Sequence, residues 1–303
     1  MGRFSAKDDL MHPIAPDVPH GRESFAWAVP IPHEGLLAFL YMARDADTGR
    51  YARMVAIADG LTGEPLYRDI VGDVGMDEGD DFNDCRVAGL HLRQPEPLTT
   101  ADLVYSGDGV HVEVSMRALH EPFSWHDNRD GCADWIATDR YEQSVATSGV
   151  IEVAGRTVRF ESQGHRDHSW GPRDWRPMQH WKWMNAATID GSVSLHAFVI
   201  FALGDRLVNG YVNRGGEVTP LTAIDTRADL DLTTMLHQRV RASCTDEGGR
   251  DIVLEAAGVA GLGVPARHMR MNEVACTATL DGREAIAHIE MGWPESYIRD
   301  FTG

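Results

Sequence analysis

The stretch Val110-His-Val-Glu-Val-Ser-Met-Arg117 alternates strictly between apolar and polar side chains. Successive side chains of a β-strand point to opposite faces of its sheet, so this period of two predicts a strand with one buried and one solvated face. Apolar runs bounded by turn residues lie on both sides of it, for example from Tyr51 to Ala58 and from Val193 to Leu203. A long helical period is absent, and only the segment from Asp229 to Gln238 resembles a short helix. The chain is therefore predicted to be all-β, with few short helices.

Pairs of turn-forming residues separate the apolar runs in the second half of the chain. They are Ala154-Gly155, Asp190-Gly191, Gly204-Asp205, Gly215-Gly216, Gly248-Gly249 and Asp281-Gly282. Such pairs supply the positive φ angles that tight hairpins require. Strands that recur every ~8 to 12 residues between turns are typical of a β-barrel or β-sandwich. A closed barrel can enclose a single small ligand.

The charge balance limits the classes of partner. Lys and Arg number 28 and Asp and Glu number 46, which gives a formal net charge of −18 at pH 7. A surface this acidic repels the phosphates of nucleic acid and anionic lipid headgroups, so neither is an expected partner. No apolar run approaches the ~18 residues that span a bilayer, and the polar N-terminus does not resemble a signal peptide. We expect a cytoplasmic protein, either a monomer or a homodimer.

The segment from Gly164 to Trp183 concentrates titratable and aromatic residues. It reads Gly-His-Arg-Asp-His-Ser-Trp-Gly-Pro-Arg-Asp-Trp from 164 to 175 and His-Trp-Lys-Trp from 180 to 183. Carboxyl and imidazole groups transfer protons, and indole faces stabilise positive charge. The mixture therefore indicates cation chemistry in an aromatic pocket. The alternative is structural, with the Trp rings as packing and a loop pinned by ion pairs among Arg166, Asp167, Arg173 and Asp174.

The stretch from Leu119 to Arg140 is second in its density of such residues, and it includes Trp125 and His126. Binding and catalytic residues are often carried by irregular segments on a rigid scaffold. We expect this stretch to form the opposite wall or the lid of the same site. The alternative is a plain connector between two halves of the protein.

Several motifs of cofactor chemistry are missing from the sequence. It has no Gly-x-Gly-x-x-Gly after a strand, no phosphate-binding loop that ends in Lys-Ser or Lys-Thr, and no Gly-x-Ser-x-Gly nucleophile elbow. Its four cysteines form no Cys-x-x-Cys pair, and His165, His168 and His180 do not have the spacing of a known metal motif. We therefore expect neither a cofactor nor a bound metal.

One set of motifs resembles a known superfamily. Glu23-Ser24 near the start, Tyr141-Glu142-Gln143, and Gly-x-Arg-Asp-His-Ser-Trp-Gly-x-Arg-Asp-Trp from 164 to 175 resemble the superfamily of carotenoid 1,2-hydratase, AttH-like proteins and fungal kievitone hydratases. The resemblance implies two lipocalin-like β-barrels packed together. We place the first in residues 1–140, because the irregular stretch ends there, and the second, carrying the motif, in residues 141–303.

The resemblance also implies an activity. Members are associated with the addition of water to an isoprenoid double bond, and some relatives resemble cyclases, including Diels–Alder-type catalysts. The His-x-Trp element of the hydratase site falls on His168 and Trp170. The Tyr-x-Asp pair expected of the carotenoid enzyme is not evident after Trp183, where Leu195-His196-Ala197 stands instead. This departure puts a carotenoid substrate and the identity of the proton donor in doubt.

These observations lead to one working hypothesis with two alternatives. The protein is predicted to be a cofactor-independent hydratase, dehydratase or cyclase that acts on a hydrophobic, isoprenoid-like small molecule. Asp167 is the first choice for the acid, because burial among Trp rings raises the pKa of a carboxyl group; if a neighbouring arginine lowers that pKa, His168 takes the role. The other predicted site residues are His165 and Asp174 as further catalytic groups, Trp170, Trp175, Trp181, Trp183, Trp125 and His126 as substrate contacts, and Arg166 and Arg173 as structural ion pairs. The alternatives are a lipocalin-like carrier and a pericyclic cyclase that only fixes a reactive conformer.

Overall fold

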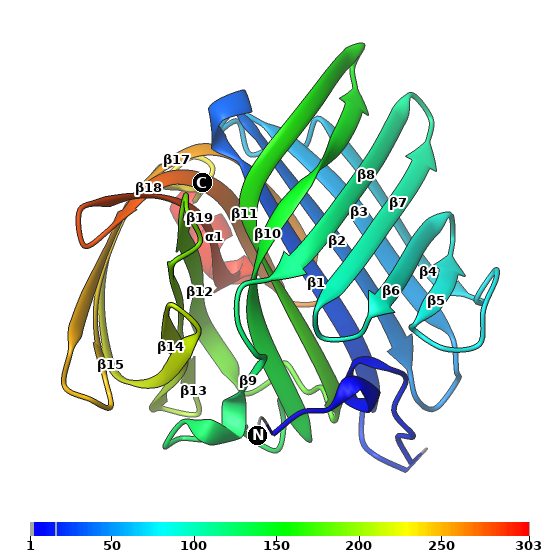
Figure 1. The fold of residues 1–303 in the computed structure, drawn as a ribbon, viewed down its shortest axis with the longest axis horizontal. Coiled ribbons are helices and arrows are strands. Elements are labelled where there is room, and N and C mark those ends of the chain that lie inside the picture. The colour runs from blue at the N-terminus through cyan, green and yellow to red at the C-terminus, as the bar shows by residue number, and fades with distance from the viewer. Residues whose placement is uncertain (1–2, 16, 303) are drawn as a thin grey trace.

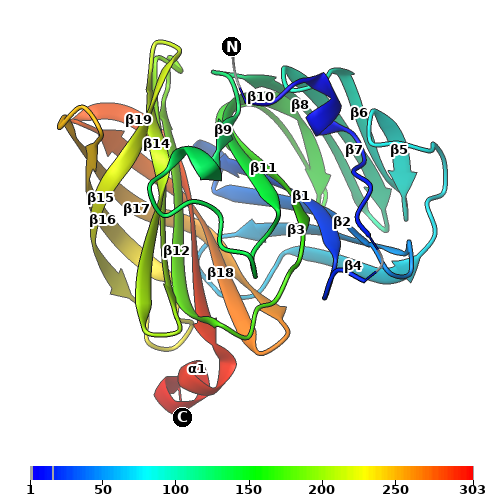
Figure 2. The same cartoon turned by 90° about the horizontal axis from the view of Figure 1, so that it is seen from below.

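The computed structural model describes residues 3–15 and 17–302 and shows an all-β protein built from two antiparallel sheets. The sheets lie side by side in both views of Figures 1 and 2. The only α-helix among the described residues, α1 (Glu295–Thr302), follows the last strand at one end of the molecule. None of the described helices is long and apolar enough to cross a membrane.

The first sheet is strongly curved and has eleven strands. Along the sheet the order is β4-β3-β2-β1-β11-β10-β8-β7-β6-β5, and β9 pairs with β10. The strands are β1 (Arg22–Ile31), β2 (Leu36–Asp45), β3 (Tyr51–Asp59), β4 (Tyr67–Val74), β5 (Asp84–Val87), β6 (Leu90–Glu96), β7 (Thr100–Gly107), β8 (Val110–Ala118), β9 (Phe123–Ser124), β10 (Asp139–Val153) and β11 (Arg156–Gly171). Short 3₁₀ turns lie at Ala6–Asp9, Pro32–Glu34 and Trp125–Asp127.

The second sheet is a closed barrel in which each strand pairs with the next along the chain. Its strands are β12 (Met178–Thr188), β13 (Val193–Ala202), β14 (Asp205–Arg214), β15 (Glu217–Leu230), β16 (His237–Asp246), β17 (Asp251–Ala266), β18 (Met269–Leu280) and β19 (Arg283–Pro294). The predicted hairpin turns are present. Asp281 and Gly282, with φ angles of 49° and 77°, join β18 to β19, as expected for a turn with positive φ at both central residues.

Among the described residues there are three large apolar clusters and a small fourth one around Phe4, Leu98 and Tyr141. One lies inside the curved first sheet and another inside the barrel, so both interiors are packed with side chains. The third lies where the outer faces of the two sheets meet. Alternation along β1 shows how one strand serves two clusters, since Phe25 and Trp27 pack into the first interior while Ala26 and Ala28 face the second sheet.

One expectation from the sequence is corrected. The segment from Asp229 to Gln238 contains no helix and runs from the end of β15 through a turn to the start of β16. The turn is held by hydrogen bonds such as that from Thr233 N to Asp231 Oδ1 at 2.7 Å. The predicted domain boundary after residue 140 falls inside β10. The chain changes sheets later, between Gly171 and Met178, so the motif strand β11 belongs to the first sheet. As a boundary between folding units, residue 140 stays a prediction.

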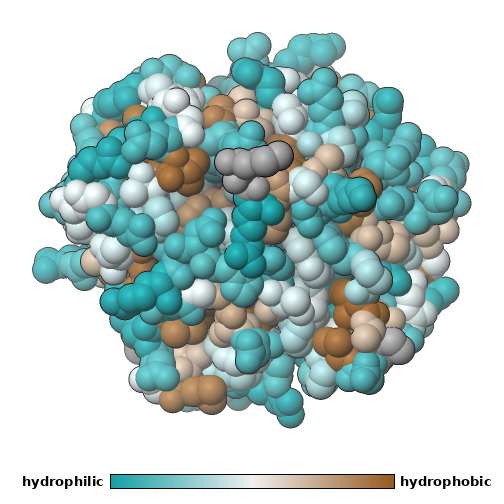
Figure 3. Space-filling view, turned by 60° about the horizontal axis from the view of Figure 1, so that its bottom comes forward, coloured by the Kyte–Doolittle hydropathy of each residue, from teal (hydrophilic) through white to brown (hydrophobic). Residues whose placement is uncertain are grey.

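The face shown in Figure 3 is mostly hydrophilic, with small scattered hydrophobic patches. This matches the excess of acidic residues in the composition. The titratable residues of the sequence motif from His165 to His168 are instead buried in the interior.

Candidate active site

A cavity of about 310 Å³ lies between the two sheets. Strands β1, β2 and β3 form one wall with residues such as Ala26, Phe39 and Met54, and the barrel forms the other with Phe198 and Ile200. Four of the predicted aromatic contacts line it, namely Trp125, Trp175, Trp181 and Trp183. Its volume is at the lower end of the ~300 to 1,000 Å³ typical of small-molecule sites. The sequence suggested a ligand inside a barrel, whereas this cavity lies between the sheets because both interiors are filled.

Asp167 lines this cavity from the C-terminal part of β11. Its carboxylate pairs with the guanidinium of Arg140, and its Oδ1 accepts a hydrogen bond of 2.9 Å from the backbone N–H of Ala26. Burial, together with the negative charge of Glu142, raises the pKa of Asp167 to about 7 against the opposing effect of Arg140. A carboxyl group with this pKa exchanges protons near neutral pH.

Glu142, on β10, is the hydrogen-bonding hub behind Asp167. Its carboxylate accepts hydrogen bonds from Trp125 Nε1 at 3.0 Å, Trp183 Nε1 at 3.2 Å and Arg140 Nε at 2.7 Å. His165 Nε2 lies 2.8 Å from its second oxygen. Burial tends to raise the pKa of Glu142, but Arg140 and the neighbouring imidazoles hold it well below its ordinary value. Glu142 is therefore an ionised buried carboxylate that fixes two of the cavity's Trp rings.

A second carboxyl group, Glu290 on β19, reaches the cavity from the barrel. Its Oε1 accepts a hydrogen bond from Trp181 Nε1. Glu273 stands opposite it on β18, and His288 Nε2 lies 2.8 Å from Glu273 Oε2. Burial, and then the charge of Glu273, raise the pKa of Glu290 well above its ordinary value, and burial raises the pKa of Glu273 to about 8. These shifts favour the protonated form of Glu290, because two adjacent buried carboxyl groups cannot both ionise.

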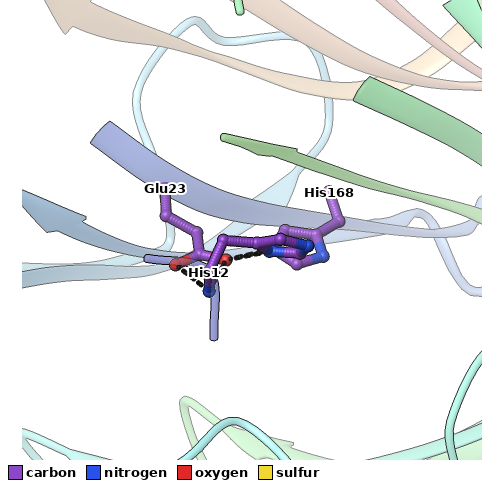
Figure 4. Close-up of side chains that lie close together, drawn as sticks. All are labelled: His12, Glu23 and His168. Atoms are coloured by element: carbon purple, nitrogen blue, oxygen red, sulfur yellow. Dashed lines mark hydrogen bonds and ion pairs between the residues drawn. The ribbon is translucent and has the colours of Figure 1, made fainter. Parts of the chain in front are cut away.

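His168 and Trp170 do not reach the cavity. They alternate with Asp167 along β11 and so lie on the opposite face, inside the first sheet. His168 Nε2 lies 3.0 Å from Glu23 Oε1, and His12 Nδ1 lies 2.7 Å from the same oxygen (Figure 4). The Trp170 ring stacks on His12 with centroids 3.6 Å apart. Through contacts with Asp8 and His12, this face of β11 binds the N-terminal arm, the segment that precedes β1, to the sheet.

Four other predicted residues also serve outside the cavity. His165 is fully buried beside Glu142 and stacks on His196 at 5.1 Å. Asp174 pairs with Arg176 near the surface, and exposed His126 lies 3.0 Å from the carbonyl oxygen of Thr138. Arg166 forms a buried ion pair with Asp9 at 3.2 Å. The four motif residues Arg166, Asp167, Arg173 and Asp174 therefore do not form one ionic knot. Alternation places Arg166 and Asp167 on opposite faces of β11, where they pair with Asp9 and Arg140, and Asp174 pairs with Arg176.

Two groups of described residues bring three potential metal ligands within 4.8 Å of one another. They are His12, Glu23 and His168 inside the first sheet, and Glu142, His165 and His196 between the sheets. In the first group both imidazoles lie within hydrogen-bond distance of Glu23, so a buried hydrogen-bond network accounts for it. In the second group His165 lies within hydrogen-bond distance of Glu142, whereas His196 Nε2 lies 3.8 Å from it.

Sequence reasoning missed Glu290, Glu273 and Arg140. The run from His288 to Met291 alternates polar and apolar residues, which is typical of a strand with one face in water. That polar face instead packs against the first sheet, so Glu290 is only 8% exposed. The Trp-rich β12 was a signal that the outer face of the barrel is buried, since large aromatic side chains such as Trp181 and Trp183 on that face are expected to pack against other residues.

Residues 5–295 match the protein family described as "Domain of unknown function (DUF7064)". The chain belongs to this family. Among curated proteins, none matches its sequence. The family assignment covers both sheets and every residue of the cavity.

Solved structures share the fold. A putative AttH from Nitrosomonas europaea superposes with a TM-score of 0.67 at 15% identity, over 92% of this chain and 93% of that chain. Kievitone hydratase from Nectria haematococca gives 0.59 at 10% identity over 94% and 93%. CghA, in complex with Sch210972, gives 0.59 at 13% identity over 90% and 88%. The resemblance to the AttH and kievitone hydratase superfamily is thus confirmed at the level of the fold.

Proposed function

We propose that the protein is a hydratase, dehydratase or cyclase that performs acid–base chemistry on a hydrophobic, isoprenoid-like substrate in the cavity between the sheets. The observation that carries this proposal is the pair of carboxyl groups, Asp167 and Glu290, that reach one Trp-lined cavity from opposite sheets. Two titratable groups whose environments differ are the usual arrangement for an acid and a base in one site.

Glu290 is the acid in this proposal. Burial favours its protonated form, which transfers its proton to a carbon of the substrate's double bond and leaves a carbocation. The faces of Trp181 and Trp183 stabilise that cation, each by about 0.5–2 kcal/mol. Asp167, which the sequence suggested as the acid, acts as the base, because Arg140 and the N–H of Ala26 favour its ionised form.

Water completes the reaction as a hydration. Its oxygen bonds to the cation while its proton passes to Asp167, and solvent then returns the proton to Glu290. The same steps in reverse are a dehydration. In a cyclisation a second double bond of the substrate captures the cation, and the resulting ring cation loses a proton to Asp167 to give a neutral alkene. The similarity in fold to a kievitone hydratase supports this class of chemistry, and the substrate is proposed from the apolar lining of the cavity.

The test is solvent-deuterium incorporation. The protein is incubated in D₂O with C10 to C30 isoprenoid alkenes and alcohols, and products are read by mass spectrometry. We expect the wild type to incorporate deuterium, and Glu290→Gln and Asp167→Asn to lose about 10²- to 10⁴-fold in rate. Asp174→Asn, which removes a carboxylate of the same motif outside the cavity, is the matched control and should retain the wild-type rate.

Two outcomes contradict the proposal. Substrates that bind in the cavity but return unchanged, without deuterium, indicate a carrier. An equal loss in Asp174→Asn and Asp167→Asn shows that the effect comes from the motif's structure and not from the cavity carboxylate.

A further inference from the structure

Five arginines line the cavity, an unusual number for an apolar site in an acidic protein; they are Arg22, Arg53, Arg140, Arg173 and Arg267. Arg53 is paired with Asp69 at 2.5 Å, and Arg140 is paired with Glu142 and Asp167. Arg267 is exposed. Arg22 and Arg173 have no salt bridge with a carboxylate within residues 3–15 and 17–302, so their charges are not matched in the same way.

Arg173 follows β11 in the connection to the barrel and is only 8% exposed. Its Nη2 donates a hydrogen bond to Ser169 Oγ, but its buried Nε has no hydrogen-bond partner. Arg22, the first residue of β1, also has a buried Nε without a partner, and its guanidinium lies 5.6 Å from the centroid of the Tyr41 ring. A buried donor left unpaired is costly, and more so on a charged group.

The positive charges of the two guanidinium groups also repel each other. Burial, together with the positive charges of Arg140 and Arg22, lowers the pKa of Arg173 to about 10. Three cations therefore meet at one end of the cavity, where the carboxylates of Glu142 and Asp167 are already engaged by Arg140. An anion at this position would supply the missing acceptors and relieve the repulsion.

We propose that Arg22 and Arg173 form an anion subsite, and that the substrate is an apolar molecule with a carboxylate group. This inference rests on the proposed function and names the substrate's class. A guanidinium donates two parallel hydrogen bonds to a carboxylate. The charge of Asp167 acts on Arg173, so it also repels an incoming anion, and a monoanion meets less repulsion there than a phosphate dianion.

The subsite orients the substrate. The carboxylate end lies at Arg22 and Arg173, and the hydrocarbon extends along the apolar walls towards the barrel. Glu290 and Trp181 belong to that barrel wall, so the proton donor acts on a carbon remote from the carboxylate.

The experiment compares one carbon skeleton in three forms, namely an isoprenoid carboxylic acid, its methyl ester and its alcohol. Binding is measured by isothermal titration calorimetry and by quenching of Trp fluorescence. For the wild type we expect the acid to bind about 10- to 100-fold more tightly than the ester, the range expected for hydrogen bonds to a charged group. In Arg173→Gln and in Arg22→Gln this preference should fall about 10-fold or more, while the affinity for the alcohol stays unchanged. Arg159→Gln, which removes an exposed arginine of β11, should keep the wild-type preference.

Each outcome decides something. Equal affinity for acid and ester in the wild type overturns the anion subsite but leaves the proposed function standing, since both ligands still occupy the cavity. Failure of all three forms to bind or quench counts against the cavity itself, and so against the proposed function as well. If Arg173→Gln does not fold, as judged by circular dichroism, Arg22→Gln decides the question, and an unchanged acid preference in that variant overturns the proposal.

Discussion

Replacing Glu142 by glutamine should destabilise the protein strongly, although the two side chains have nearly the same volume. The carboxylate accepts from Arg140, Trp125 and Trp183 and lies 2.8 Å from His165 Nε2. A glutamine offers one acceptor oxygen and places an NH₂ group against donors. It also leaves the buried Arg140 with Asp167 as its only carboxylate partner among the described residues.

The magnitude follows from these contacts. A hydrogen bond to a charged group contributes about 1.5–3 kcal/mol, and removal of one partner from a buried ion pair costs about 3–5 kcal/mol. These terms describe the same atoms and are not additive, so we expect Glu142→Gln to lower the free energy of unfolding by about 3–5 kcal/mol. That is a large part of the ~5–15 kcal/mol of an ordinary domain.

Urea denaturation followed by circular dichroism measures this loss, with Asp174→Asn as control. Asp174 carries the same charge, but its partner Arg176 is exposed, so that variant should change the midpoint little. A second effect is specific to the hub: the Glu142 charge raises the pKa of Asp167, so the substitution should lower it. A loss below about 1 kcal/mol, well under the buried-pair range, would refute the view that an ionised Glu142 organises the site.

Two further predictions concern the barrel wall of the cavity. Burial raises the pKa of Glu273 from 4.5 to about 8, so between these pH values the folded chain binds more protons than the unfolded chain. The free energy of unfolding should therefore fall as pH rises through this range. Urea titrations at several pH values should show a smaller fall for Glu273→Gln than for the wild type. Gly292→Ala would place a Cβ 2.2 Å from the Trp181 ring, so it should displace the indole and weaken ligand binding in fluorescence titrations. Gly72→Ala, with nothing within 4 Å of its Cβ, should bind as the wild type does, and equal binding by both variants would contradict the role of Trp181.

Local sequence pattern predicted the strands and many of the turns. The alternation from Val110 to Arg117 became β8, and Asp281-Gly282 became the turn between β18 and β19. The helix expected from Asp229 to Gln238 was wrong, because its polar residues cap a turn instead of covering a helix face. Period and turn chemistry are local properties, so they can be read without knowing what packs against each strand.

The site was predicted less completely, because its composition depends on how the two sheets pack. The Trp-rich segment did identify Asp167, Trp175, Trp181 and Trp183 as neighbours of one cavity. Glu290 looked solvent-facing, because a strand with one polar face is ordinarily half exposed. Only the contact between sheets, which joins residues far apart in the chain, buries that face and raises the pKa of the carboxyl group on it.

The alternation of β11 explains why one motif holds so many kinds of residue. Arg166 and His168 point into the first sheet, where Asp9 and Glu23 tie down the N-terminal arm. His165 and Asp167 point the other way, towards the barrel and the cavity. Arg166 and His168 are buried and paired, so they hold β11 in register. This register determines where Asp167 lies relative to Trp183. A substitution of Arg166 or His168 should therefore disturb the cavity without touching it, which makes the motif a joint requirement of fold and site.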